Sequence, residues 1–214
     1  MSSMPTWIER DFQCTPFAQI ANEMKQWINT PSSVPQLWFG EHPVVVTKGV
    51  RAQQDVVEYW PSVATNRGGQ LTMHLPGQLV FYPLWEVLQY TTIEQYRWIF
   101  EEIVMQSIAE ISLGSINTYR VSESPGVFTE RGKIASLGLR LYRKSVYHGI
   151  SFNIACPLGP FQTFICCGNS SMSTTSIRAL GSFATMAQVK ALMKKYFYLL
   201  LAKETSRVAH HSSS

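Results

Sequence analysis

The chain has 214 residues, of which 45% are hydrophobic and 15% are charged, and its formal net charge is +4. This length fits one domain with a sizeable core, and the low share of charged residues indicates a globule with much apolar surface. The basic residues form no dense run and no apolar run reaches membrane-spanning length, so neither a nucleic-acid partner nor a membrane span is expected.

The four cysteines, Cys14, Cys156, Cys166 and Cys167, have neither the spacing of a zinc site nor that of a secreted disulfide framework. Residues 1–11 lack the apolar segment of a signal peptide. We therefore expect a cytoplasmic protein with free thiols. The modest positive charge favours acidic partners, such as small acidic carrier proteins.

Apolar residues at helical spacing predict an amphipathic helix over residues 16–29. Two short strands are expected over residues 36–40 and 44–48, because a proline interrupts the apolar run between them. His42 lies in that connection and is interpreted as a turn residue in preference to a catalytic one.

The segment over residues 67–82 combines a glycine pair and a Pro-Gly step with strand-like residues, and it predicts two turns between three strands. Glycines there allow the backbone to approach a ligand closely. Arg67 opens the segment and could either bind an acidic group or orient the loop.

The strongest helix is expected over residues 91–111, where Thr91 and Glu94 fit a capping box. A strand over residues 116–120 and a turn over residues 124–126 follow. The next residues predict a hairpin with Gly132 in its loop.

Two runs rich in β-branched and aromatic residues, 134–142 and 146–154, predict paired strands. A short helix is expected from residue 176 to 180, and a final helix over residues 187–201. The chain is thus interpreted as one domain over residues 1–205, followed by a disordered tail over residues 206–214.

Lys133 and Cys167 stand at the two ends of this paired-strand region. Residues on neighbouring strands can meet in space although they are distant in sequence. A nearby cation lowers the pKa of a thiol, and the thiolate attacks carbonyl groups far better than the thiol does. An activated thiol is therefore one chemistry that the region can support, beside the plainer interpretation of a buried structural cysteine.

Six ordered motifs together resemble those of the lipoyl(octanoyl) transferases, which move an octanoyl group from acyl carrier protein to a lysine of lipoate-dependent enzymes. They are Glu41-His42-Pro43; Arg67-Gly68-Gly69-Gln70-Leu71-Thr72-Met73-His74-Leu75-Pro76-Gly77-Gln78; Pro125-Gly126-Val127; Lys133-Ile134-Ala135-Ser136-Leu137-Gly138; His148-Gly149-Ile150-Ser151-Phe152-Asn153; and Cys167-Gly168.

The resemblance implies an α/β (α+β) fold: a single domain with mixed β-sheets flanked by helices, similar to the catalytic domains of biotin and lipoate protein ligases. It implies octanoyl-acyl carrier protein as the donor, lipoyl domains as acceptors, a cysteine thioester intermediate, and no cofactor or metal. By the same resemblance Cys167 is the nucleophile and Lys133 its activating residue. The implied substrate-binding residues are Arg67, Gly68, Gly69, Gln70, Leu71, Thr72, Met73, His74, Ser136, Leu137, Gly138, Gly149, Ile150 and Ser151.

Two positions depart from the family pattern. Leu75 replaces a glycine, and Cys166 replaces a proline. Leucine is disfavoured at positive φ, so we expect Leu75 to adopt an ordinary backbone conformation and its side chain to line or border the acyl pocket. For His74 and His148, a structural role and a role in proton transfer remain open.

Three other functions remain open at this point. An ATP-dependent lipoate or biotin ligase has the same fold and needs no cysteine. A catalytically inactive relative would only bind acyl chains or carrier proteins, and a cysteine–histidine hydrolase would release the acyl group to water.

Overall fold

Two β-sheets of unequal size form the framework of the computed structural model, which describes residues 6–30, 34–52, 59–86, 91–163 and 173–211. The strands are β1 (Ile8–Cys14), β2 (Gln36–Glu41), β3 (Val45–Lys48), β4 (Ser62–Ala64), β5 (Leu71–His74), β6 (Gln78–Glu86), β7 (Tyr119–Val121), β8 (Ser124–Thr129), β9 (Gly132–Tyr142) and β10 (Ser145–Asn153). The helices are α1 (Phe17–Asn29), α2 (Ile93–Ile111), α3 (Met186–His211) and the short 3-10 helix η1 (Gly159–Gln162).

Both sheets are mixed. The larger has seven strands in the order β1-β2-β6-β10-β9-β8-β7, and the smaller has three in the order β4-β3-β5. In the larger sheet β1 runs parallel to β2 and the other pairs are antiparallel. In the smaller, β3 runs parallel to β4 and antiparallel to β5. The predicted α/β domain with mixed sheets and flanking helices is confirmed.

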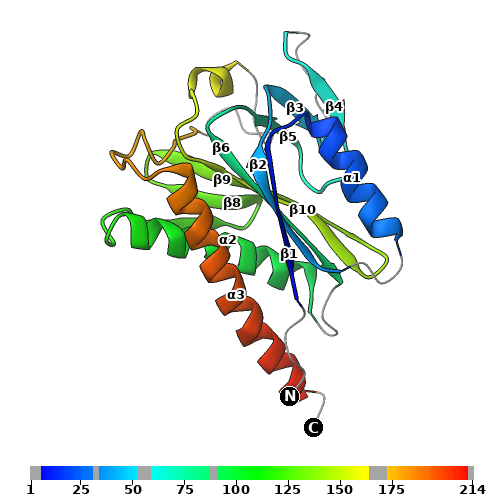
Figure 1. Cartoon of the computed structure of the whole chain (residues 1–214). Coiled ribbons are helices and arrows are strands. Elements are labelled where there is room, and N and C mark those ends of the chain that lie inside the picture. Colours follow the sequence, from blue (N-terminus) through cyan, green and yellow to red (C-terminus); the bar gives the residue numbers. More distant parts are fainter. Residues whose placement is uncertain (1–5, 31–33, 53–58, 87–90, 164–172, 212–214) are drawn as a thin grey trace.

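The helices cover the two faces of the larger sheet because side chains alternate along its strands. Leu37 and Phe39 of β2 belong to the apolar cluster that includes α2 and α3, whereas Trp38 between them packs with α1. Figure 1 shows α3 crossing the sheet diagonally, with α1 on the opposite side of β1. Two apolar layers therefore enclose the sheet.

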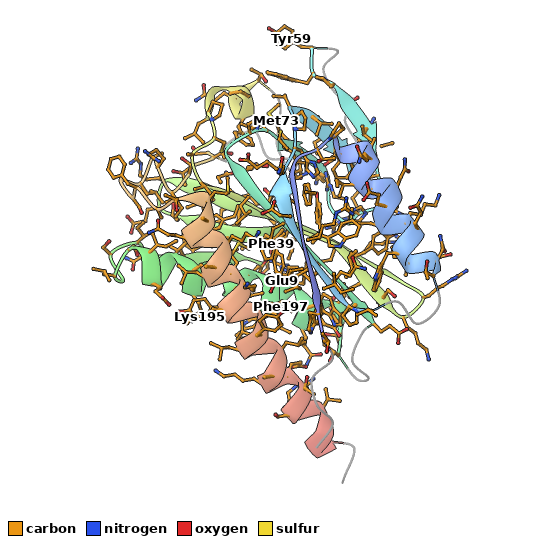
Figure 2. All side chains as sticks on the ribbon, in the orientation of Figure 1. Glu9, Phe39, Tyr59, Met73, Lys195 and Phe197 are labelled. Atoms are coloured by element: carbon orange, nitrogen blue, oxygen red, sulfur yellow. The ribbon has the colours of Figure 1, made fainter. Side chains whose placement is uncertain are left out.

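Aromatic residues of strands and helices pack against one another within the mainly aliphatic core. The rings of Phe39 and Phe81 stack with their centroids 4.5 Å apart, and Phe197 of α3 meets Phe81 edge-on. Figure 2 shows Phe39 and Phe197 in the interior, whereas Tyr59 projects from the top of the molecule. Among the described residues, no helix combines the length and apolarity needed to cross a membrane.

Most predicted elements occur close to their expected positions: α1, β2, β3, α2 and the β9–β10 pair. The capping box of α2 is shifted by one residue, since the Thr92 side chain accepts a hydrogen bond from the Gln95 amide and Gln95 caps the Thr92 amide in return. The expectation of Thr91 and Glu94 was wrong because Thr92 and Gln95 satisfy the same capping pattern.

The tertiary structure corrects four other expectations. Residues 124–126 form the start of β8 instead of a turn, and residues 177–181 form a turn instead of a helix. β1 was missed because it is an edge strand on which Phe12 alone is fully buried. α3 continues to His211, through much of the expected tail, because no Gly or Pro follows Leu201.

Candidate active site

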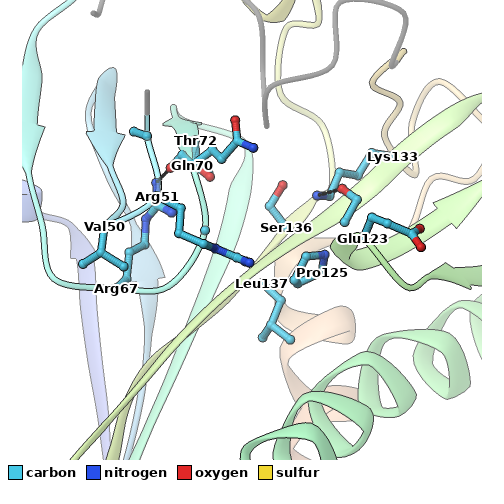
Figure 3. A pocket seen from close by; sticks show the side chains of 13 residues that line it. Val50, Arg51, Arg67, Gln70, Thr72, Glu123, Pro125, Lys133, Ser136 and Leu137 are labelled. Carbon is cyan, nitrogen blue, oxygen red and sulfur yellow. Dashed lines mark hydrogen bonds between the residues drawn. The ribbon is translucent and has the colours of Figure 1, made fainter. Parts of the chain in front are cut away.

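A cavity of about 420 Å³ opens between the loop before β5 and strands β8 and β9 (Figure 3). This volume lies in the range of about 300–1,000 Å³ that is usual for small-molecule sites. Seven of the predicted site residues line it: Arg67, Gly69, Gln70, Thr72, Lys133, Ser136 and Leu137. The fold therefore brings together two motifs that are far apart in sequence, those that begin at Arg67 and at Lys133.

Arg67 is buried and holds one wall of this cavity. Its guanidinium donates to the carbonyl oxygens of Thr47, Gly68 and Gln70 at 2.6–3.0 Å, and to the Thr47 hydroxyl. Gly138 of β9 lies directly against its stem, because a Cβ there would come within 2.8 Å of Arg67 Cδ. Of the two roles considered for Arg67, the geometry supports orienting the loop.

Lys133 forms the opposite wall. It is only 4% exposed, and its Nζ donates to the Ser124 hydroxyl at 3.1 Å. The same nitrogen lies 5.3 Å from the centre of the Phe128 ring, within range of a cation–π interaction. A buried lysine at a cavity wall has the position that an activating or proton-accepting group requires.

The backbone of Lys133 is paired with the segment that follows the predicted nucleophile. Its amide donates to Ser173 at 2.8 Å, and its carbonyl accepts from the Thr175 amide at 3.0 Å. Cys167 itself, together with Cys166, lies outside the described residues. The predicted thiol–lysine contact stays a prediction.

A second, smaller cavity of about 20 Å³ lies beside the first, and the two share Arg67, Thr72, Ser136 and Leu137. It is also lined by His74, Gly138 and the predicted residues of β10, Gly149, Ile150 and Ser151. A third cavity of about 290 Å³, lined in part by Gly68 and Gly69, borders the first on the side of α2. Together these three spaces reach twelve of the predicted substrate-binding residues.

Leu71 and Met73 lie elsewhere, although they belong to the same predicted segment. Both are buried in an apolar cluster with Val46 and Phe161. Successive side chains of a strand point to opposite faces, so Thr72 and His74 of β5 line the cavities while Leu71 and Met73 point away from them.

Leu75 belongs to this second group. It is 1% exposed and packs in the cluster of Met73 and Phe161, outside the lining of the three cavities. Its φ is not positive, as expected. The expectation that its side chain borders the acyl pocket was wrong, because the chain direction set by β5 turns it into the core.

The rings of three buried histidines, His42, His74 and His148, have their centroids 5.4–6.4 Å from that of Phe17. His42 is tied on both ring nitrogens, to the Thr15 carbonyl at 2.6 Å and the Tyr82 hydroxyl at 3.0 Å. Burial lowers the pKa of His42 to about 4. His42 is thus a structural residue of the β2–β3 connection.

His74 and His148 are also held neutral. Burial lowers the pKa of His148 to about 3 and that of His74 well below its ordinary value. His74 Nδ1 lies 3.2 Å from the Gln78 side-chain oxygen, and His148 Nε2 lies 2.9 Å from that of Asn66. These hydrogen bonds give both histidines a structural role. Because both also line the small cavity, a role in proton transfer stays open.

The cysteines within the described residues are poor candidates for an activated nucleophile. Burial raises the pKa of Cys156 to about 12, and burial also raises the pKa of Cys14. Neither lines one of the three cavities. Neither residue is therefore suited to act as a nucleophilic thiolate.

Sequence reasoning missed several residues that line the main cavity, among them Arg51, Glu123 and Ser124. Figure 3 shows the side chain of Arg51 extending into the cavity from the Arg67 side, opposite Lys133. Nothing in their local pattern marks Arg51 or Glu123. Ser124 stands directly before the Pro-Gly-Val motif, which was a usable signal.

Comparisons with known proteins show the family of the chain. Residues 18–198 match the family described as Lipoyl protein ligase A/B catalytic domain. An octanoyltransferase from Cellvibrio japonicus is 34% identical over 197 residues, which cover 89% of this chain and 90% of that protein. An octanoyltransferase from Yersinia pseudotuberculosis is 30% identical over 213 residues, which cover 97% of this chain and 90% of that protein.

Solved structures share the fold at low sequence identity. A lipoate-protein ligase A bound with ATP has a TM-score of 0.75 at 13% identity, covering 92% of this chain and 86% of the other. A bi-partite lipoate protein ligase from Thermoplasma acidophilum has a TM-score of 0.73 at 13% identity, and the match covers 92% of this chain and 84% of the other. A biotin protein ligase from Aquifex aeolicus has a TM-score of 0.53 at 14% identity, and the match covers 95% of this chain and 70% of the other.

Proposed function

The chain belongs to the lipoyl protein ligase A/B catalytic-domain family and, within it, to the octanoyltransferases, and we propose that it carries the octanoyl group on Cys167. It is an acyltransferase that moves octanoyl groups in protein lipoylation. The proposal adds a donor, an acceptor and a mechanism. The donor is octanoyl-acyl carrier protein, the acceptor is a lysine of a lipoyl domain, and the compartment is the cytoplasm.

The observation that carries the proposal is the position of Lys133. Its amine is buried at the wall of the main cavity, opposite the loop held by Arg67. Its backbone pairs with Ser173. Cys167 precedes Ser173 by six residues, and an extended segment of that length spans at most about 20 Å. The connection is thus short enough for the thiol to meet the lysine at the cavity.

In the first proposed step the Cys167 thiolate attacks the thioester carbonyl of the donor. The bond from the carbonyl carbon to the carrier sulfur breaks, the carrier thiol leaves with a proton donated by the Lys133 ammonium group, and octanoyl remains on Cys167 as a thioester. In the second step the acceptor lysine amine attacks this thioester. An amide forms, the Cys167 sulfur leaves, and the proton of the attacking amine passes to neutral Lys133.

The cavity residues have matching roles in this scheme. The main cavity, with a volume of about 420 Å³, accommodates an extended acyl chain together with the reacting groups. Backbone amides of the glycine-containing segments 67–70 and 136–138 are candidates to stabilise the oxyanion of each tetrahedral intermediate. Because a thioester is activated relative to an amide, the second step is downhill, and the scheme needs no ATP and no metal.

Intact-mass measurement after incubation with octanoyl-acyl carrier protein tests the proposal. We expect an adduct of about 126 Da, the mass of octanoyl replacing the thiol hydrogen. Cys167→Ser should lose the adduct and the transfer activity, whereas Cys156→Ser, the matched buried cysteine, should keep both. Persistence of the adduct in Cys167→Ser would assign the nucleophile to another residue.

The ATP-dependent ligase remains the second candidate, because ligases are among the neighbours in fold. It predicts octanoylation of a lipoyl domain from free octanoate that requires ATP and Mg²⁺. A hydrolase predicts free octanoate from the carrier thioester without an acceptor, and an inactive relative predicts no turnover. Modification of a lipoyl domain from the carrier thioester alone separates the proposed transferase from all three.

A further inference from the structure

The side chain of Lys133 contacts three residues of strand β8. Its Nζ donates to the Ser124 hydroxyl at the start of that strand, at 3.1 Å, and faces the Phe128 ring near its end. Between them Gly126 lies against the lysine stem, because a Cβ there would come within 2.7 Å of Lys133 Cε. Only glycine allows this close approach, which brings Ser124 within hydrogen-bond distance.

Strand β8 is in turn fixed by a buried carboxylate of α2. Glu101 is 1% exposed, and its Oε1 accepts from the Gly126 amide at 2.8 Å and from Arg97 Nε at 2.9 Å. Its Oε2 lies 3.3 Å from Arg120 Nε in β7. Charge-assisted hydrogen bonds of this kind are stronger than those between neutral groups, so the Gly126 backbone is held firmly.

From these contacts we propose that Ser124 is a positioning residue for Lys133, with Glu101 anchoring the strand that carries it. A serine hydroxyl can donate and accept. It accepts from Lys133 as an ammonium ion and donates to Lys133 as a neutral amine. The hydroxyl therefore keeps Nζ directed at the cavity before and after proton transfer. The proposal rests on the role of Lys133 in the proposed function.

The test compares Ser124→Ala with Ser124→Thr. Loss of one hydrogen bond to a charged group should lower the kcat of octanoyl transfer by about 10- to 100-fold, with the KM for the carrier thioester unchanged. Ser124→Thr keeps the hydroxyl and should recover most of the rate, since Ser124 borders the cavity and an added methyl group has room there. Ser107→Ala is the matched control, because this buried hydroxyl bonds within α2 to Ile103 and should leave the rate unchanged.

A double-mutant cycle identifies the partner. If Ser124 acts through Lys133, Ser124→Ala should slow adduct formation in the wild-type background and have no further effect in Lys133→Ala. Wild-type rates in Ser124→Ala, or an equal loss in both backgrounds, would overturn the positioning role while leaving the proposed function intact. Wild-type rates in Lys133→Ala would instead remove Lys133 from the mechanism, and the positioning role with it.

Discussion

The guanidinium of Arg67 binds both oxygens of Thr47, with Nη2 2.6 Å from the carbonyl and 2.8 Å from the hydroxyl. Thr47 belongs to β3, and its hydroxyl also donates to the Thr72 carbonyl of β5 at 3.2 Å. Arg67 therefore joins the cavity loop to the smaller sheet. A fork of several fixed N–H groups is needed to reach these oxygens at once.

Arg67→Lys should destabilise the protein although it keeps the charge. A lysine has a single nitrogen and cannot reach Thr47, Gly68 and Gln70 together, so we expect the free energy of unfolding to fall by at least about 2 kcal/mol. Urea denaturation measures this loss, and kcat/KM for transfer should fall with it. Arg143→Lys at the exposed β9–β10 turn is the control. Equal stability of the two variants would contradict the bridging role.

Leu75→Ala should affect stability and leave substrate choice alone. Truncating a buried leucine costs about 2–5 kcal/mol, and Leu75 is 1% exposed in its cluster. The relative kcat/KM for acyl chains shorter and longer than octanoyl should match wild type. Leu137→Ala, which enlarges both the main and the small cavity, should shift preference toward longer chains. A shifted profile in Leu75→Ala would place that side chain at the ligand.

Stability should fall when the pH drops below the ordinary histidine pKa of 6.5. His42 and His148 have folded-state pKa values of about 4 and about 3, and the pKa of His74 is also lowered, in each case chiefly by burial. Below pH 6.5 the unfolded chain binds protons that the folded protein excludes. Each histidine then removes up to about 1.4 kcal/mol of stability per pH unit, until the pH reaches its folded pKa.

Urea denaturation between about pH 6.5 and pH 5 measures this slope, because carboxyl groups titrate mainly at lower pH. His42→Asn should be less stable at neutral pH, since it loses the bonds to Thr15 and Tyr82. The dependence of its free energy of unfolding on pH should be less steep than that of wild type, by about the contribution of one histidine. An unchanged slope would show that the pKa of His42 is the same in the folded protein as in the unfolded chain.

Lys133→Ala should slow both acylation of Cys167 and transfer to the acceptor. Removing a cation from beside the thiol should raise the pH at which the Cys167 thiolate forms. Thiolate absorbance in a Cys14→Ala/Cys166→Ala background measures this, because the pKa of the remaining Cys156 is raised to about 12 and its thiol does not titrate in the same range. Coincident titration curves with and without Lys133 would exclude electrostatic activation.

Much of the fold follows from local pattern. The spacing of Phe17, Ile20, Met24, Trp27 and Ile28 predicted α1, and those residues are buried in it. The β-branched runs predicted β9 and β10, and they pair as expected. Helical and strand periodicities are local properties, so they can be recognised before any tertiary contact is known.

The sequence also predicted the family and seven residues that line the main cavity, because the motifs occur as contiguous segments in a recognisable order. It could not determine which side chains of a motif reach the cavity. Thr72 and Leu71 are neighbours in one motif, yet the orientation of β5 sends one into the cavity and the other into the core.

The hydrogen bond between Lys133 and Ser124 could be found only in the tertiary structure. The local sequence pattern predicted a turn over residues 124–126, whereas the hydrogen bond to the Glu101 carboxylate and the pairing with β9 hold these residues as a strand. The same holds for the packing of Leu75 in the core and for the binding of carbonyl oxygens by Arg67. Each of these outcomes depends on residues far away in sequence, and packing and hydrogen bonding between such residues are determined only when the whole chain has folded.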